Sequence, residues 1–196
     1  MLGSNELMNS RVSSSEEMLA TIVCERIKAR ERPALLIGGL GMGFTLRAAL
    51  GALGSGARVV VAELVPGVVV WARGALRDIF GDDLSDPRVT IHEGDVGDLI
   101  RPARSKFDAI LLDVDNGPQG LVREANDRLY SANGLNAAYT ALRPGGVLAV
   151  WSTAADVAFT QRLRKIGFEV EERSARASRK GGGARHVIWL ATRRMQ

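Results

Sequence analysis

Residues 34–63 read ALLIGGLGMGFTLRAALGALGSGARVVVAE, and this stretch decides the fold. Two short apolar runs, at 34–39 and 58–64, flank a longer helical pattern at 43–53. Apolar runs that are short and nearly continuous are typical of strands covered on both faces. The glycines between the first run and the helix let the backbone turn sharply and approach a ligand closely. The stretch therefore predicts a strand–helix–strand unit that contains a ligand-binding turn.

The same alternation of strands and helices continues to the end of the chain. Further strands are expected at 88–95, 107–114, 147–152, 168–175 and 186–193, and further helices at 13–29, 66–80 and 155–166, with another helix ending near 142. The last two strands have no helix between them, so we expect them to pair antiparallel. The sequence predicts a doubly wound, mostly parallel α/β sheet in three layers. It forms one domain at 31–196, preceded by a segment and helix at 1–30 that could act as a lid.

Composition narrows the class of protein. The chain has 196 residues, of which 46% are hydrophobic, enough for one well-packed core. A single cysteine, Cys24, excludes an internal disulfide and indicates a reducing compartment. No apolar run approaches the ~18 residues of a membrane span, and the N-terminus lacks the apolar core of a signal peptide. We therefore expect a cytoplasmic protein that makes no membrane contact.

Charged and metal-binding residue types add two expectations. His92 and His186 lie far apart without cysteine or carboxylate spacing around them, so no metal site is expected. Residues 162–196 carry ten Lys or Arg against three acidic residues. Such a basic segment suits nucleic acid or an anionic substrate, but a solvated surface is the more ordinary explanation.

The glycine-rich turn and the acid after it point to a nucleoside ligand. Gly38, Gly39, Gly41 and Gly43 lie between the first strand and a helix whose N-terminus would face a ligand. Glu63 ends the second strand, 20 residues after Gly43. A doubly wound fold places there the carboxylate that accepts hydrogen bonds from ribose hydroxyls.

Two further acids close the next two strands. Asp95 stands beside the apolar Val96, a pair that suits an adenine whose exocyclic amine needs an acceptor. Asp113 closes the fourth strand and would face the same crevice at the carboxyl ends of the strands. Leu64, next to Glu63, is expected to contact the same ligand. Acids at three successive strand ends predict a bound nucleoside with a cationic group nearby.

Several segments together resemble the catalytic domain of spermidine synthases and their methyltransferase-like relatives. The segments are IGGLGMGFTLRAAL, VVVAELVP, DPRVTIHEGD, FDAILLDVDNGP and LRPGGVLAVWS, within residues 33–153. The resemblance implies a seven-stranded sheet of order 3-2-1-4-5-7-6 with the last strand antiparallel, and a homodimer. It also implies that Glu63 binds ribose, that Asp95 binds adenine and that Asp113 stands beside the transferred group.

The sequence also departs from that family. Aminopropyltransferases typically carry GGGDGG, whose aspartate helps to hold the amine of the donor, whereas this loop reads GGLGMG and has no acid. Their catalytic loop resembles DSSDPxGP, whereas residues 113–118 read DVDNGP, two residues shorter. Asp115 in this loop is a candidate catalytic residue beside Asp113, and it is equally a candidate for stabilising the turn. The N-terminal β-domain and the tyrosines of the polyamine pocket have no evident counterpart.

These departures leave several functions open. The favoured one is a small-molecule methyltransferase that uses S-adenosylmethionine, and the alternative is an aminopropyltransferase that uses decarboxylated S-adenosylmethionine. In either reaction the enzyme aligns a small-molecule acceptor, which could be an amine, and excludes water. An RNA or DNA methyltransferase is less favoured because only 5% of residues are aromatic and no Asn-Pro-Pro-Tyr-like motif follows the fourth strand. A nucleoside-binding protein without catalysis is the remaining reading.

Overall fold

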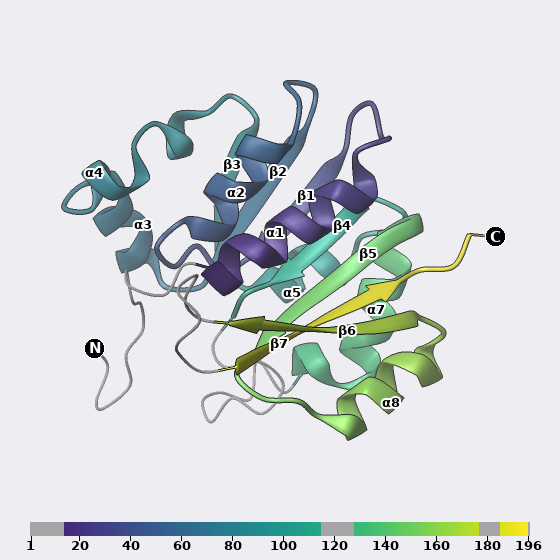
Figure 1. Cartoon of the computed structure of the whole chain (residues 1–196). Helices are drawn as coiled ribbons and strands as arrows, with labels where there is room; N and C mark the ends of the chain where they lie inside the picture. Colours follow the sequence, from purple (N-terminus) through teal and green to yellow (C-terminus); the bar gives the residue numbers. More distant parts are fainter. Residues whose placement is uncertain (1–13, 115–127, 177–184, 196) are drawn as a thin grey trace.

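The structure is a computed structural model that describes residues 14–114, 128–176 and 185–195. Within these ranges one seven-stranded sheet has the order β3-β2-β1-β4-β5-β7-β6 (Figure 1). Strands β1 to β5 pair in parallel, and β7 pairs antiparallel with both β5 and β6. The strands are β1 Ala34–Gly38, β2 Arg58–Glu63, β3 Val89–Glu93, β4 Phe107–Leu112, β5 Leu142–Ser152, β6 Glu169–Arg176 and β7 Arg185–Thr192. The predicted α/β class, strand order and antiparallel end are confirmed.

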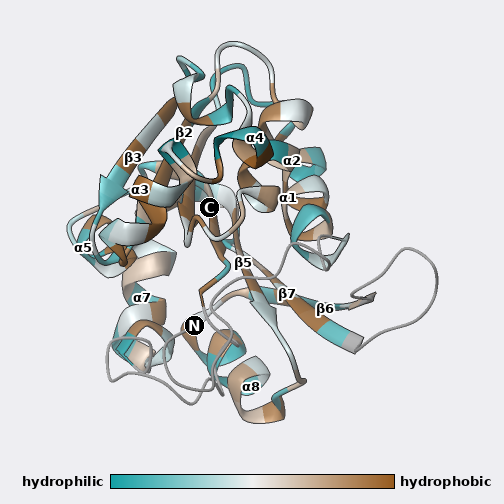
Figure 2. Cartoon of the chain, turned by 90° about the vertical axis from the view of Figure 1, so that its left-hand side faces the viewer, coloured by the Kyte–Doolittle hydropathy of each residue, from teal (hydrophilic) through white to brown (hydrophobic). Residues whose placement is uncertain are grey.

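Helices cover both faces of the sheet. They are α1 Ser14–Ile27, α2 Phe44–Ala52, α3 Pro66–Arg73, α4 Arg77–Phe80, α5 Val96–Ile100, α7 Ala132–Ala141 and α8 Val157–Ile166, with a 3₁₀ turn at Asp83–Ser85. On one face α1 and α2 pack with Leu35 and Ile37 of β1 and with Ala109 and Leu111 of β4. On the other face α5, α7 and α8 pack with the even-numbered apolar residues of these strands and with Phe107. Figure 2 shows apolar residues concentrated along the strands between these helices. The result is the three-layer arrangement expected from buried parallel strands.

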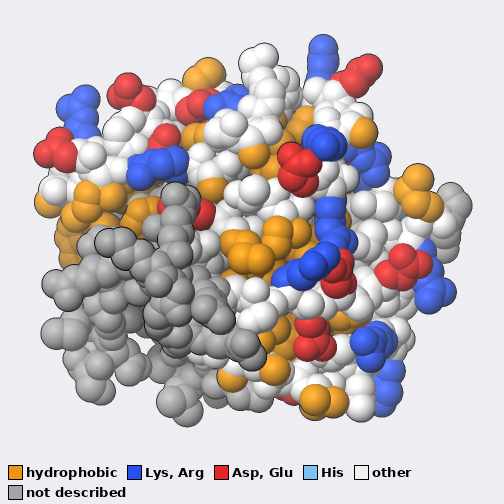
Figure 3. Space-filling model, viewed as in Figure 1, with side chains coloured by type: hydrophobic (Ala, Val, Ile, Leu, Met, Phe, Trp, Pro, Cys, Tyr) orange, Lys and Arg blue, Asp and Glu red, His pale blue; other side chains and the backbone are white. Residues whose placement is uncertain are grey.

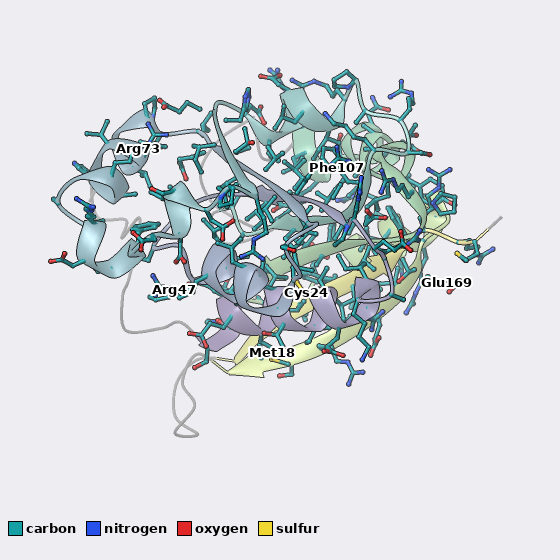
Figure 4. The ribbon with its side chains drawn as sticks, turned by 90° about the horizontal axis from the view of Figure 1, so that it is seen from above. Met18, Cys24, Arg47, Arg73, Phe107 and Glu169 are labelled. Carbon is teal, nitrogen blue, oxygen red and sulfur yellow. The ribbon has the colours of Figure 1, made fainter. Side chains whose placement is uncertain are left out.

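Helix α1 is an integral part of this packing. Leu19, Ala20 and Val23 are fully buried in the core of the α1–α2 face. Figure 4 labels Met18 and Cys24 along α1 and Arg47 on α2, which lie on the same side of the sheet. Among the described helices, none is both long and apolar enough to cross a bilayer.

Local elements differ from the sequence expectation in three places. The helix expected at 66–80 is two helices, because the chain breaks at Gly74, and both Gly74 N–H and Leu76 N–H donate to the Trp71 carbonyl. The third strand ends at Glu93 rather than 95, and Asp95 instead caps the short helix α5. Strand β5 begins at Leu142, before the Pro-Gly-Gly turn, and its pairing with β4 shifts register there.

The amino-terminal end of the sheet holds a fully buried carboxylate, Asp108 in β4. Its Oδ2 accepts hydrogen bonds from the Ala34 N–H at 2.8 Å and from Arg143 Nη1 at 2.7 Å. Arg30 Nε lies 3.7 Å from the other oxygen, Oδ1. A buried carboxylate is costly unless it is paired and hydrogen-bonded, and these contacts provide that compensation for Asp108.

Candidate active site

The carboxyl ends of the strands carry one row of functional side chains. In the pairing of β2, β1, β4 and β5, four residues lie side by side across the sheet: Ala62, Gly38, Leu112 and Val150. The row consists of the residue that follows each of them. The ladder continues one step further, since Gly39 N–H donates to the Ala62 carbonyl and Asp113 N–H to the Gly38 carbonyl. Across the sheet from β2 to β5 the row is Glu63, Gly39, Asp113 and Trp151. The parallel sheet therefore brings together residues that the sequence separates by up to 112 positions, from Gly39 to Trp151.

The glycine-rich loop needs glycine for steric reasons. Gly39, Gly41 and Gly43 all have positive φ, at 91°, 49° and 79°. A Cβ on Gly39 would collide with the main-chain oxygen of Asp113, whereas the space beside Gly41 is open. Gly38 has ordinary φ, but a Cβ there would press on Val96 at 3.2 Å. The loop thus keeps its backbone close to β4 and leaves room beside Gly41, as a ligand cradle requires.

Helix α2 starts directly from this loop. Its N-cap residue, Gly43, is in the left-handed conformation and offers no side-chain hydrogen bond to the first turn. Leu40 and Met42, the non-glycine residues of the loop, are 5% and 9% exposed. The loop therefore presents main-chain groups, and none of its own side chains is charged.

Glu63 is buried and tied to the loop. Its Oε2 accepts a hydrogen bond from Leu40 N–H and its Oε1 accepts one from Val65 N–H, both at 2.8 Å. Each carboxylate oxygen can accept a second hydrogen bond. The two amides fix the carboxylate at the edge of the loop, where ribose hydroxyls could bind it. The neighbouring Leu64 is 44% exposed, so an apolar side chain is available to cover a ligand there.

Asp95 and Val96 lie at the start of α5. Asp95 Oδ1 accepts a hydrogen bond from Gly97 N–H at 2.7 Å, which makes Asp95 the N-cap of that helix. Val96 is 5% exposed and contacts the position of Gly38. Asp95 thus has an established structural role that the sequence reading did not include. Val96 lies beside the glycine-rich loop, as a residue flanking a nucleoside would.

Asp113 is partly buried and shares its surroundings with another acid. Thr45 Oγ1 in α2 donates a hydrogen bond to Asp113 Oδ2 at 2.8 Å and lies 3.4 Å from the main-chain oxygen of Glu16. Burial raises the pKa of Asp113 to about 6, although the Thr45 hydrogen bond opposes the rise. The pKa of Glu16 in α1 is raised to about 8, first by burial and then by the charges of Asp113 and Glu17. A carboxyl with a pKa near neutrality is suited to exchanging a proton at physiological pH.

The N-terminus of α1 is fixed next to this acid pair. His186 Nδ1 in β7 lies 3.1 Å from the hydroxyl of the fully buried Ser15. The His186 ring also packs edge-on against Trp151, with ring centroids 4.6 Å apart. Burial lowers the pKa of His186, which favours its neutral form. Glu16 is therefore carried on a helix end that a buried polar contact anchors to the sheet.

The sequence reading missed Glu16 and Thr45 as site residues. Thr45 lies one residue into the helix after the glycine-rich loop, a position close enough to the cradle to have been considered. Glu16 carries no such signal, because its approach to Asp113 is a tertiary contact between segments 97 positions apart. Asp115 lies outside the described residues. No group of three or more potential metal ligands occurs among the residues that the structure describes.

A family model described as "Spermine/spermidine synthase domain" matches residues 13–165. The chain belongs to that family. A polyamine aminopropyltransferase of Mycobacterium tuberculosis is 32% identical over 133 residues, which cover 66% of this chain and 24% of the relative. One of Nitrosomonas europaea is 36% identical over 93 residues, 47% of this chain and 27% of the relative. This member of the spermine/spermidine synthase family thus spans about a quarter of the length of these curated relatives.

Solved structures share the fold of this family member. Spermidine synthase from Thermotoga maritima has a TM-score of 0.71 at 21% identity, over 94% of this chain and 60% of that one. Precorrin-6y C5,15-methyltransferase from Geobacter metallireducens has a TM-score of 0.64 at 14% identity, over 95% and 92% of the two chains. The fold is therefore common to aminopropyl and methyl transfer, and the site has to decide between them.

Proposed function

We propose that this chain transfers an aminopropyl group from decarboxylated S-adenosylmethionine to an amine acceptor. The observation that carries the proposal is the row formed by Glu63, Gly39 and Asp113, in which two acids flank the glycine-rich loop. We assign ribose binding to Glu63 and proton acceptance to Asp113. The family match and the curated relatives, which are named polyamine aminopropyltransferases, support the aminopropyl alternative over the methyltransferase that the sequence reading favoured.

The residues fit an adenosine-bearing donor. Open space beside Gly41 leaves room for the ligand, and Glu63 retains acceptor capacity beyond the hydrogen bonds to Leu40 and Val65. Leu64 and Val96 would supply apolar contacts, and Asp95 an acceptor for the exocyclic amine. The same residues would hold methylthioadenosine, the product that remains after transfer.

The chemistry is an in-line displacement. The nitrogen lone pair of the acceptor forms a bond to the propyl carbon next to the sulfonium, and the carbon–sulfur bond breaks with its electron pair going to sulfur. The acceptor nitrogen loses one proton, and we assign Asp113 as the group that takes it. A pKa raised to about 6 makes Asp113 a better proton acceptor near neutrality than an ordinary aspartate. The rest of the catalysis is alignment and exclusion of water.

Methyl transfer from S-adenosylmethionine is the second candidate. The specific observation in its favour is the uncharged glycine-rich loop, in which Gly41 stands where an aminopropyltransferase typically has an aspartate. The two reactions differ in whether the donor keeps its carboxylate, so relative donor affinity separates them.

Nucleic acid as substrate has less support. Figure 3 shows positive and negative side chains interspersed over the face that carries α1 and α2, without a continuous basic surface. Within the basic C-terminal segment, Arg173 pairs with Glu171 and Arg194 lies 3.7 Å from Glu169. The predicted homodimer and cytoplasmic location stay predictions.

The test is titration calorimetry with decarboxylated S-adenosylmethionine, S-adenosylmethionine and methylthioadenosine, followed by a turnover assay with linear diamines. We expect tighter binding of the decarboxylated donor, and formation of methylthioadenosine only when a diamine is present. Asp113→Asn should abolish turnover but keep nucleoside binding, and Asp98→Asn, an exposed aspartate paired with Arg101, is the matched control. Preference for S-adenosylmethionine together with methylation of an acceptor would replace the proposal with the second candidate.

A further inference from the structure

Glu16 enters the site from an element outside the row of strand ends. It lies in the first turn of α1, on the same side of that helix as Leu19 and Val23, which pack into the core. Thr45 lies between residue 16 and Asp113, since its hydroxyl donates to the Asp113 carboxylate and lies 3.4 Å from the Glu16 carbonyl. Helices α1 and α2 are in extensive contact, so this placement follows from the packing of the core.

Within residues 14–114, 128–176 and 185–195, no Lys or Arg pairs with the carboxyl of Glu16 or with that of Asp113. Asp108, which lies in β4 five residues before Asp113, has two arginines close to it. Partly buried carboxyls without a counter-ion are costly, and the cost falls when a proton or an external cation is bound.

Of a proton and an external cation, the groups around Glu16 and Asp113 favour the external cation as the partner of the two carboxyls. Trp151 occupies the neighbouring position of the row and packs on the same face as α1 and α2. His186 is held neutral by burial and bonded to Ser15, so it does not supply the missing charge. The glycine-rich loop contributes no side-chain charge of either sign.

We propose that Glu16 and Asp113 together bind a primary ammonium group, with Glu16 supplying the carboxylate that the glycine-rich loop lacks. The inference rests on the proposed function and adds a specificity residue to it. Two carboxylates favour the ammonium of an aminopropyl tail or of a diamine. They disfavour a donor that carries its own carboxylate beside the amine, because the like charges repel.

Glu16→Gln tests the inference, with Glu25→Gln on the same helix as the matched control, since Glu25 is exposed and pairs only with Lys28 among the described contacts. The probes are methylthioadenosine and S-adenosyl-3-thiopropylamine, which has neutral sulfur and adds an amine to the same nucleoside. A third titration adds 1,4-diaminobutane to the methylthioadenosine complex. We expect Glu16→Gln to weaken one of the two amine ligands by at least tenfold and to change methylthioadenosine affinity by less than twofold. Whichever amine is affected identifies the donor tail or the acceptor as the group bound.

A second readout is proton release. Binding of the ammonium to the wild type at pH 7.5, titrated in buffers of different ionisation enthalpy, should release protons from the carboxyl pair, and Glu16→Gln should release fewer. If Glu16→Gln binds both amine ligands as the wild type does, the inference is wrong while the proposed function stands. If the wild type binds neither nucleoside, the proposed function fails and the inference fails with it. Loss of methylthioadenosine binding in Glu16→Gln would also overturn it, because the effect would then be structural.

Discussion

Replacing Glu63 by glutamine should weaken the fold and the nucleoside site together. The amide keeps one acceptor oxygen, so one of the two amides that bond the carboxylate, those of Leu40 and Val65, would face an NH₂ group. Glu63 is only 7% exposed, so water does not readily replace the lost partner. A buried N–H without an acceptor costs about 1–3 kcal/mol, and the remaining hydrogen bond loses the benefit of the charge. We expect a loss of about 2 kcal/mol, or a Tm about 4–8 °C lower for a chain of this size.

Affinity for methylthioadenosine should fall by about 10–100-fold, because one or two charge-assisted hydrogen bonds to the ribose weaken. The assays are thermal unfolding by circular dichroism and titration calorimetry at a temperature where both proteins are folded. Glu93→Gln is the control, since Glu93 occupies the position paired with Glu63 on β3 but is exposed. Unchanged methylthioadenosine affinity in Glu63→Gln, or an equal loss in the control, would refute the ribose-binding role.

Three further changes test the site. Gly39→Ala should cost several kcal/mol in urea unfolding, because φ is +91° and the new Cβ meets the Asp113 carbonyl; a variant as stable as wild type would contradict the cradle geometry. In the wild type the pKa of Glu16 is raised to about 8, so the stability that its protonated form gives below the usual pKa of 4.5 is lost as pH rises through 8. The Glu16→Gln variant has no such loss, and its stability relative to wild type should be about 1–3 kcal/mol greater at pH 9 than at pH 5. Equal stabilisation at both pH values would show that the carboxyl does not titrate abnormally. His186, whose pKa is lowered, contributes stability that is present above about pH 6.5 and lost as pH falls. The urea midpoint of His186→Gln should therefore fall less than that of wild type between pH 7.5 and pH 5. An equal fall in both proteins would argue against the buried contact of His186 with Ser15.

The parallel core could be predicted because its strands are buried on both faces. A run such as 107–112 is apolar at almost every position, and glycine or an acid marks its end. The positions of the strand ends also predicted that Glu63 and Asp113 lie at the same edge of the sheet, because the carboxyl ends of parallel strands share one edge.

Two local features of the sequence led to wrong predictions, at Asp95 and at Gly74. Asp95 was assigned to a strand, although an Asp followed three residues later by Asp98 is also typical of a helix N-cap. The break at Gly74 was missed because the flanking residues continue a helical pattern, and a single glycine is often tolerated in a helix.

The acid pair of Glu16 and Asp113 could not be predicted. The sequence presents Glu16 as one of two acids in a first helical turn, where the helix dipole is reason enough for a negative charge. Only the angle at which α1 packs on α2 brings it to Thr45, and that angle depends on the shapes of many core side chains. The contact is therefore a property of the assembled core and not of any local motif.

Asp108 in strand β4 and Asp113, the residue after that strand, should differ in how they tolerate substitution. Asp108 is enclosed by guanidinium and amide donors, so nearly every replacement there should reduce the amount of protein that accumulates in a cell. Asp113 has no counter-ion among the described residues, so neutral replacements should leave protein abundance unchanged or raised while abolishing growth that depends on catalysis. A saturation library of residues 107–113, scored separately for protein abundance and for growth, should therefore separate Asp108 from Asp113. Asp108 would be constrained by the stability of the fold, and Asp113 would be constrained only by the reaction that the protein catalyses.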